Sequence, residues 1–350
     1  MKPGKTLQEL LLEIERQAEL KKDYLFDTAT VSYVPAEDGD IIQAEGLSDT
    51  FHVKDIAHSQ IGQHLEIPAK YYNRMRSESP ELLATNVNHW FHSNPSQRMF
   101  RTLDGSLRAF LSNKYRRIDN AEIAETVLPI LAEMPEVLIE SCEITDSRMY
   151  IKAVNPRITT EVTKGDIVQS GIIISNSEVG QGSVNISPLV YRLVCSNGMI
   201  AQDDAVRKYH VGRAGEADSD FSIFRNETIE ADDKAFLMKV EDAVRAAANQ
   251  ERFERIVGKL RESTEVKIEP VNVPKVVELA SKPFNLTLKE SEGILGHLIQ
   301  GGDFSKYGLA NAVTRHAQDV DSYDRSTELE ATGYKIITMA PSLWHQITKV

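Results

Sequence analysis

The segment MFRTLDGSLRAFLSNKYRRIDN, residues 99–120, decides the fold of the middle of the chain. Two strand-like stretches surround Asp104 and Gly105, a pair that favours a tight type I′ turn between antiparallel strands. Asp119 or Asn120 then provides a helix cap, and apolar residues recur at helical spacing after it. The segment therefore predicts a β-hairpin followed by a helix.

Strand patterns continue downstream of this helix. Four stretches rich in β-branched and apolar residues are expected to be strands: residues 137–144, 149–154, 168–175 and 184–195. Asn197 and Gly198 follow the fourth stretch as a second primed-turn signal. We therefore expect positive φ angles at Gly105 and Gly198, and the order hairpin, helix, antiparallel meander.

Helical patterns dominate the two ends of the chain. Residues 7–20 have apolar residues at spacings of three and four, and residues 24–53 read as a strand hairpin. Near the C-terminus, Thr287 and Glu290 form a capping box before another helix. The sequence predicts an α+β fold in which a central antiparallel sheet is flanked by N-terminal and C-terminal helices.

The length of 350 residues exceeds the size, about 250 to 300 residues, at which a single core usually stops growing. We therefore predict three regions. These are an N-terminal mixed α/β region (1–97), a central antiparallel sheet domain (98–226) and a C-terminal helical region (227–350).

Composition excludes several classes of protein. Hydrophobic residues at 41% and charged residues at 26% are typical of globular chains. No apolar stretch approaches the roughly 18 to 20 residues needed to span a bilayer, and no signal peptide is evident, so we expect a cytoplasmic protein that does not bind membranes. Cys142 and Cys195 have no CxxC context, which excludes a disulfide framework.

Charge is distributed unevenly along the chain. The net charge is −12, yet residues 98–117 contain six basic residues and one acidic residue, Asp104. Aromatic residues interleave with these cations, a combination that suits single-stranded nucleic acid because cations follow phosphates and rings stack on bases. The predicted nucleic-acid-binding residues are Arg98, Arg101, Arg108, Lys114, Tyr115, Arg116 and Arg117. The alternatives are that the basic run is a solvated face and that Phe110 points into the core.

The usual motifs of enzymes are missing from the sequence. It contains no GxGxxG after a strand, no GxSxG and no HExxH, and His89 and His92 have no carboxylate nearby in sequence. We therefore expect no metal and no cofactor. Cys195 with His210 could form a nucleophile and base, but a buried cysteine at a strand end explains the same residue.

Several segments resemble a known family. They are KKDYLFDT, IPAKYYNRM, LLATNVNHWF, LRAFLSNKYRRIDN, NSEVGQGSVNISPLVYRLVCSNGMI and NAVTRHAQDVDSYDRSTELEATGYKI. Together they resemble the phage/plasmid-like protein family, domain of unknown function 932, over residues 21–337. The resemblance implies a mobile element in a bacterial cytoplasm and a role in replication, recombination or conflict with host defence. It implies no residue-level activity.

These observations give ranked expectations for function. The first is a phage or plasmid protein that binds or anneals single-stranded DNA in replication or recombination, in line with a fold order similar to that of phage single-strand annealing proteins. Such a protein would form a homo-oligomer. The second is a module that binds a host protein, because the acidic end regions suit a basic partner. The third and least favoured is an undescribed enzyme using Asn113, Asp119, His210 or Cys195.

Overall fold

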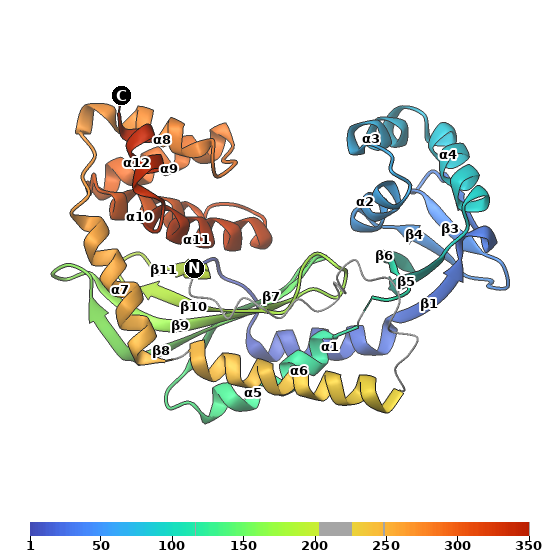
Figure 1. The fold of residues 1–350 in the computed structure, drawn as a ribbon, viewed down its shortest axis with the longest axis horizontal. Helices are drawn as coiled ribbons and strands as arrows, with labels where there is room; N and C mark the ends of the chain where they lie inside the picture. Colours follow the sequence, from blue (N-terminus) through green and yellow to red (C-terminus); the bar gives the residue numbers. More distant parts are fainter. Residues whose placement is uncertain (116, 203–225, 248, 350) are drawn as a thin grey trace.

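The structure is a computed structural model that describes residues 1–115, 117–202, 226–247 and 249–349. It confirms the α+β class (Figure 1). In the described part of the chain, the strands form two sheets in place of the single central sheet that we predicted. None of the described helices is both long and apolar enough to cross a membrane.

The first sheet has six strands in the order β1-β5-β6-β4-β3-β2. Their bounds are β1 (Lys22–Asp27), β2 (Val31–Val34), β3 (Ile41–Ala44), β4 (Thr50–Val53), β5 (Gln97–Leu103) and β6 (Ser106–Ser112). The β5–β6 hairpin, which we assigned to the central domain, instead pairs with β1 and β4. The boundary predicted between residues 97 and 98 therefore falls inside β5.

Aromatic burial explains why the hairpin joins this sheet. The Phe100 ring lies 5.2 Å from the Phe110 ring, which stacks on Phe91 of α4 at 5.7 Å. The helices on this face are α2 (Asp55–His64), α3 (Ala69–Glu78) and α4 (Pro80–Ser93). Phe100 and Phe110 are thus core residues, so the core alternative for Phe110 is correct.

The second sheet is the predicted meander. Its antiparallel order is β11-β10-β9-β8-β7. The strands are β7 (Leu138–Ile144), β8 (Met149–Glu161), β9 (Ile167–Asn176), β10 (Asn185–Arg192) and β11 (Asn197–Ile200). Side chains alternate between two cores: Ile151 and Ile172 face one, whereas Tyr150 and Ile173 face the other. Because both faces are apolar, both must be covered.

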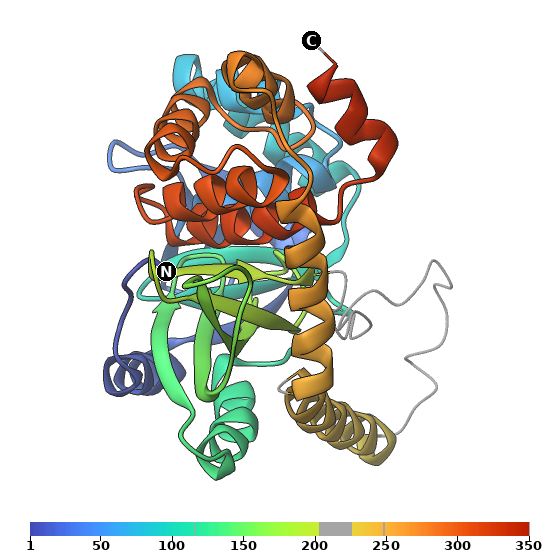
Figure 2. The ribbon, with the colours of Figure 1, turned by 90° about the vertical axis from the view of Figure 1, so that its left-hand side faces the viewer.

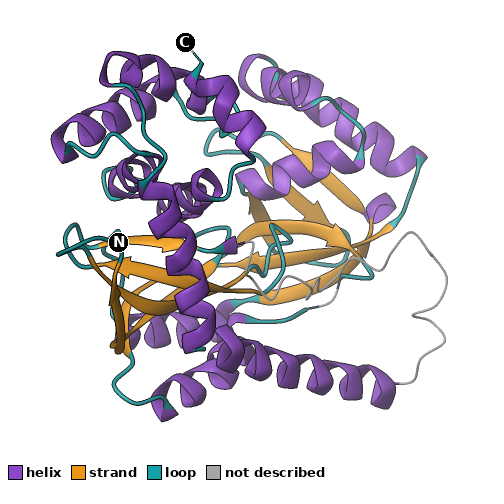
Figure 3. Ribbon diagram, turned by 60° about the vertical axis from the view of Figure 1, so that its left-hand side comes forward, coloured by secondary structure: helices purple, strands orange, loops and turns teal. Residues whose placement is uncertain are grey.

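Helices cover both faces of this second sheet (Figure 3). One layer contains α1 (Leu7–Leu20), α5 (Asn120–Glu133) and α6 (Asn226–Ala247). The opposite layer contains α10 (Lys306–His316) and α11 (Tyr323–Ile337), beside α8 (Val273–Ser281), α9 (Leu288–Gly301) and α12 (Pro341–Thr348). α7 (Gln250–Thr264) runs past the edge of the sheet from one layer to the other (Figure 2). Short 3₁₀ segments occur at Thr28–Thr30 and Pro270–Asn272.

The two turn predictions have different outcomes. Asp104 and Gly105 both have positive φ, 50° and 70°, as a type I′ turn requires, so the first prediction is confirmed. The second is wrong: Asn197 and Gly198 belong to β11 and pair with β10, while the preceding Ser196 has the positive φ of 50°. A Cβ on Gly198 would lie 2.7 Å from Met1 Cγ, so this glycine permits close packing.

Candidate functional site

The basic residues of the β5–β6 hairpin lie where the two sheets meet. The register of the hairpin shifts beside Arg101, and Arg108 is the extra residue of the resulting bulge. A bulge redirects a side chain, and here both arginines meet Glu178 in the loop after β9. Arg101 Nη1 donates to the Glu178 backbone oxygen at 2.9 Å, and Arg108 Nη2 donates to Glu178 Oε2 at 2.7 Å.

The Arg101 side chain is completely buried, and its guanidinium is paired with carboxylates. Its side chain is 0% exposed and donates to both carboxylate oxygens of Asp23, at 2.8 and 3.1 Å, and to Asp119 at 2.8 Å. Burial alone would lower the pKa of this guanidinium, but the Asp23 and Asp119 carboxylates raise it. Burial alone would likewise raise the pKa of Asp119, yet Arg101 and Lys21 lower it. Arg101 is therefore committed to internal ion pairs.

Lys21 completes this largely buried group, which we call the junction cluster: Lys21, Asp23, Arg101, Arg108, Asp119 and Glu178. Lys21 Nζ lies 2.7 Å from Asp119 Oδ2 and 3.2 Å from Glu178 Oε1. The Asn120 backbone N–H donates to the same Glu178 oxygen at 2.7 Å. The junction cluster thus joins the first sheet, α5 and the second sheet.

Carboxylates pair with three arginines of the basic run, Arg101, Arg108 and Arg117, so these three do not form an isolated positive surface. Arg117, 57% exposed, lies 3.4 Å from Asp23, and the Arg98 guanidinium lies 4.9 Å from the centre of the Phe110 ring. Lys114 is exposed. Arg116 lies outside the described residues.

Tyr115 packs against the same junction. Its hydroxyl donates to the Ser177 backbone oxygen at 3.1 Å, and burial raises the pKa of the phenol. The ring packs beside the small core formed by Leu111 and Val179. Tyr115 therefore has a structural role, and base stacking by its ring stays a prediction.

The residues considered for catalysis do not meet in the described structure. Cys195 is half-buried and accepts from Arg192 Nη1 at 3.4 Å, whereas His210 lies outside the described residues. Asp119 is held in the junction cluster. Asn113 is exposed beyond the end of β6.

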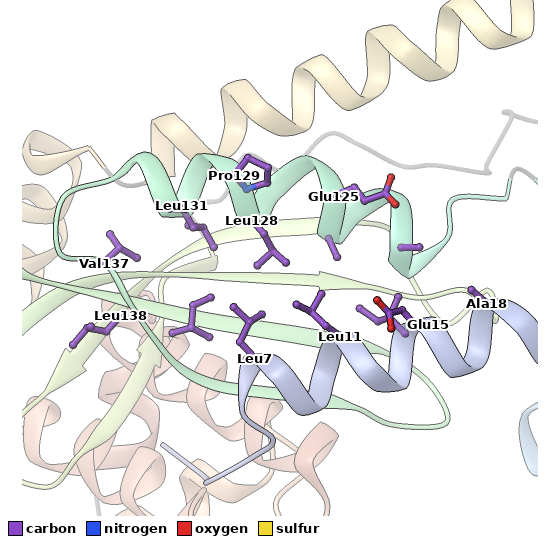
Figure 4. Close-up of a pocket in the computed structure, with 15 residues that line it drawn as sticks. Leu7, Leu11, Glu15, Ala18, Glu125, Leu128, Pro129, Leu131, Val137 and Leu138 are labelled. Atoms are coloured by element: carbon purple, nitrogen blue, oxygen red, sulfur yellow. The ribbon is translucent and has the colours of Figure 1, made fainter.

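A second feature of the structure is an apolar groove between α1 and α5, with the start of β7 beside them (Figure 4). It encloses about 950 Å³. Thirteen of its fifteen lining residues are apolar: Leu7, Leu11, Ile14, Ala18, Ala121, Ala124, Leu128, Pro129, Leu131, Ala132, Val137, Leu138 and Ile139. The other two are Glu15 and Glu125.

The groove exists because α1 has more apolar surface than the sheet can cover. Leu10 and Ile14 are buried against the body. Leu11, on the adjoining face, projects into the groove and is 36% exposed. Leu128 of α5 projects from the other wall, and Leu138 of β7 is 54% exposed. Two helices thus present facing apolar stripes with space between them.

The two helices that form this groove are acidic, and Glu15 and Glu125 lie among its lining residues. α1 carries four glutamates and one arginine, and α5 carries three glutamates and no basic residue. Carboxylates around an apolar floor favour cationic ligands. The sequence indicated the amphipathic helix of residues 7–20 and the acidic ends of the chain, but it could not show that α1 and α5 lie side by side.

Comparisons with known proteins place the chain in a family. No curated protein and no solved structure matches it. The family model described as "Domain of unknown function (DUF932)" matches residues 109–333, which run from β6 to α11 and include the second sheet. Since this match covers more than half of the chain, the protein belongs to the DUF932 family.

Proposed function

We propose that the protein is a binding module that holds a basic amphipathic helix of a partner protein in the groove between α1 and α5. The observation that carries this proposal is the lining of the groove, in which thirteen apolar residues are combined with Glu15 and Glu125. Helix-in-groove recognition uses apolar anchors at spacings of three and four residues, which match such a lining.

Burial of exposed leucines would drive the binding. Leu11 and Leu138 are 36% and 54% exposed. Complete burial of a leucine that starts fully exposed stabilises by about 1.5 to 3 kcal/mol, so each of these two gains part of that amount. Lysines flanking the anchors of the partner would approach Glu15 and Glu125, and this attraction would weaken as salt increases.

A labelled peptide tests the proposal directly. The probe is a helical peptide of about 14 residues, roughly 21 Å long, with leucines on one face and lysines on the other. Its matched control has glutamate in place of every lysine. Fluorescence anisotropy should show binding of the lysine peptide alone, with an affinity that falls as salt rises.

Variants of the protein locate the binding site. Leu11→Ala combined with Leu128→Ala should weaken binding of the lysine peptide at least about tenfold, because two anchor contacts are lost and no charge is added. Leu25→Ala is the control, since Leu25 is 60% exposed on β1, outside the groove. Equal binding of both peptides, or unchanged binding by the double variant, would overturn the proposal. Occupation of the groove by a second copy of the chain would also overturn the proposal. In that case the molecular mass in solution would rise with protein concentration for the wild type but not for the double variant.

Single-stranded DNA binding, in replication or recombination of a phage or plasmid, is a second proposal. The exposed Lys114 and the 57% exposed Arg117 beside the hairpin support it. Each phosphate contact contributes about −0.7 to the slope of log affinity against log salt. Lys114→Ala with Arg117→Ala should therefore reduce the slope by about 1.4 in titrations with a labelled oligonucleotide. If the wild-type protein does not bind the oligonucleotide at low salt, single-stranded DNA binding is ruled out.

A further inference from the structure

Two histidines and an aspartate meet beside the C-terminal helices. His297 lies in α9, His316 is the last residue of α10, and Asp319 follows in the next turn. One ligand atom from each residue lies within 4.8 Å of the other two. His297 Nε2 is 2.5 Å from Asp319 Oδ2, and His316 Nδ1 is 3.4 Å from the same oxygen.

The His316 imidazole is held beside the Asp319 carboxylate. Its side chain is 10% exposed, and its buried Nδ1 lies 3.4 Å from Asp319 Oδ2 without an aligned hydrogen bond. A ring nitrogen and a carboxylate oxygen at this separation can share one cation as ligands. Gly293 of α9 makes room for the ring, because a Cβ there would lie 2.4 Å from His316 Cε1.

The three groups lie close enough to share a small cation after modest movement of their side chains. Tetrahedral zinc with bonds of about 2.0 to 2.2 Å separates its ligand atoms by roughly 3.3 Å. The distance between His316 Nδ1 and Asp319 Oδ2, 3.4 Å, already fits, and the 2.5 Å pair would have to open by roughly 0.8 Å. Asp319 is 43% exposed, which leaves it room to move and opens the group to solvent. Arg315 Nη1, 3.7 Å from Asp319 Oδ1, orients the carboxylate from its other side.

We propose that His297, His316 and Asp319 bind a divalent cation of the zinc class. Two imidazole nitrogens and one carboxylate oxygen are the protein ligands, and water takes the remaining position. Imidazole donors favour zinc over magnesium and calcium, which prefer oxygen ligands throughout. The ion would fasten α9 to the turn after α10. This site is separate from the groove, and its test is independent of the peptide experiment.

Metal titration tests the site. The full chain, freed of metal with a chelator, is titrated with ZnCl₂ in a calorimeter, and Co²⁺ absorption provides a second readout. One ion should bind per chain, and His297→Ala or Asp319→Asn should weaken binding at least about tenfold. His89→Ala with His92→Ala in α4 is the control and should bind as the wild type does. Thermal melting of each metal-free variant verifies that it is folded.

Two glycines of α9 give a matched pair of variants. Gly293→Ala should displace the His316 ring and weaken zinc binding, whereas Gly296→Ala meets open space and should leave it unchanged. Wild-type protein that binds no Zn²⁺ at millimolar concentration would overturn the proposal. Folded His297→Ala protein with wild-type affinity, or equal effects of the two glycine variants, would also overturn it.

Discussion

Arg101 on β5 and Asp23 on β1 form a two-point ion pair in which the guanidinium is completely buried. The two residues are neighbours because β1 and β5 pair antiparallel, with Asp23 directly opposite Arg101. Arg101 also reaches Asp119 at the start of α5 and the Glu178 backbone in the loop after β9. A residue that the charge pattern assigned to a binding surface thus holds together three parts of the fold.

Replacing Arg101 should therefore cost folding stability. Arg101→Met leaves the Asp23 and Asp119 carboxylates without their buried counter-ion, and loss of one partner of a buried pair costs about 3 to 5 kcal/mol. Arg101→Lys should rescue only part of this, because an ammonium cannot make the planar two-point contact. Urea unfolding measures the effect. Arg74→Ala, in an exposed pair with Glu78, is the control and should cost under about 0.5 kcal/mol.

A second buried pair joins β8 to α11. Lys152 Nζ lies 2.6 Å from Glu330 Oε2, and both side chains are 0% exposed. Lys152→Met alone should destabilise by about 3 to 5 kcal/mol, whereas Lys152→Met combined with Glu330→Leu should cost much less, because no unpaired charge remains. Thermal and urea unfolding of four proteins, the wild type, Lys152→Met, Glu330→Leu and the double variant, form a double-mutant cycle. Additive losses would contradict this expectation.

The turn of the β5–β6 hairpin requires its glycine. Gly105 has φ of 70°, which a residue with a Cβ adopts at a cost of about 1 to 2 kcal/mol, so Gly105→Ala should destabilise by that amount. Gly296→Ala is the matched control: it lies on an exposed face of α9 with open space around it. Alanine should stabilise there by about 0.5 to 1 kcal/mol. Chemical denaturation should therefore give shifts of opposite sign.

Acid stability should depend on Glu290. Its hydrogen bond with Arg325 lowers its pKa from 4.5 to about 2. A carboxyl whose folded pKa lies below its unfolded pKa stabilises the fold above pH 4.5, and this contribution is lost as the pH falls toward 2. Glu290→Gln should remove at most about 3 kcal/mol at pH 7 and flatten the pH dependence between these values.

The control for the acid experiment is Glu278→Gln. Glu278 pairs with Lys275 at 2.9 Å on an exposed surface. Exposed pairs contribute little, so the pH dependence of unfolding should remain that of the wild type. If Glu290→Gln followed the same curve as Glu278→Gln, the Arg325 contact would not stabilise the fold.

Local signals in the sequence determined most of the elements. Asp104 and Gly105 specified a type I′ turn because few residues adopt positive φ at low cost. The capping box of Thr287 and Glu290 marked the start of α9, because these side chains satisfy the free backbone N–H groups of the first turn. Strand-like composition identified the meander. These signals act within a few residues, so the sequence by itself contains them.

Tertiary structure alone decided which elements are neighbours. Arg101 and Asp23 are 78 residues apart in the chain, and Arg108 and Glu178 are 70 apart, so the basic run looked like a surface in the sequence. α1 and α5 face each other across the groove only because both pack on the second sheet. His297, His316 and Asp319 converge through the packing of α9 on α10. Periodicity and caps specify local geometry, whereas these contacts depend on how distant apolar faces are buried together.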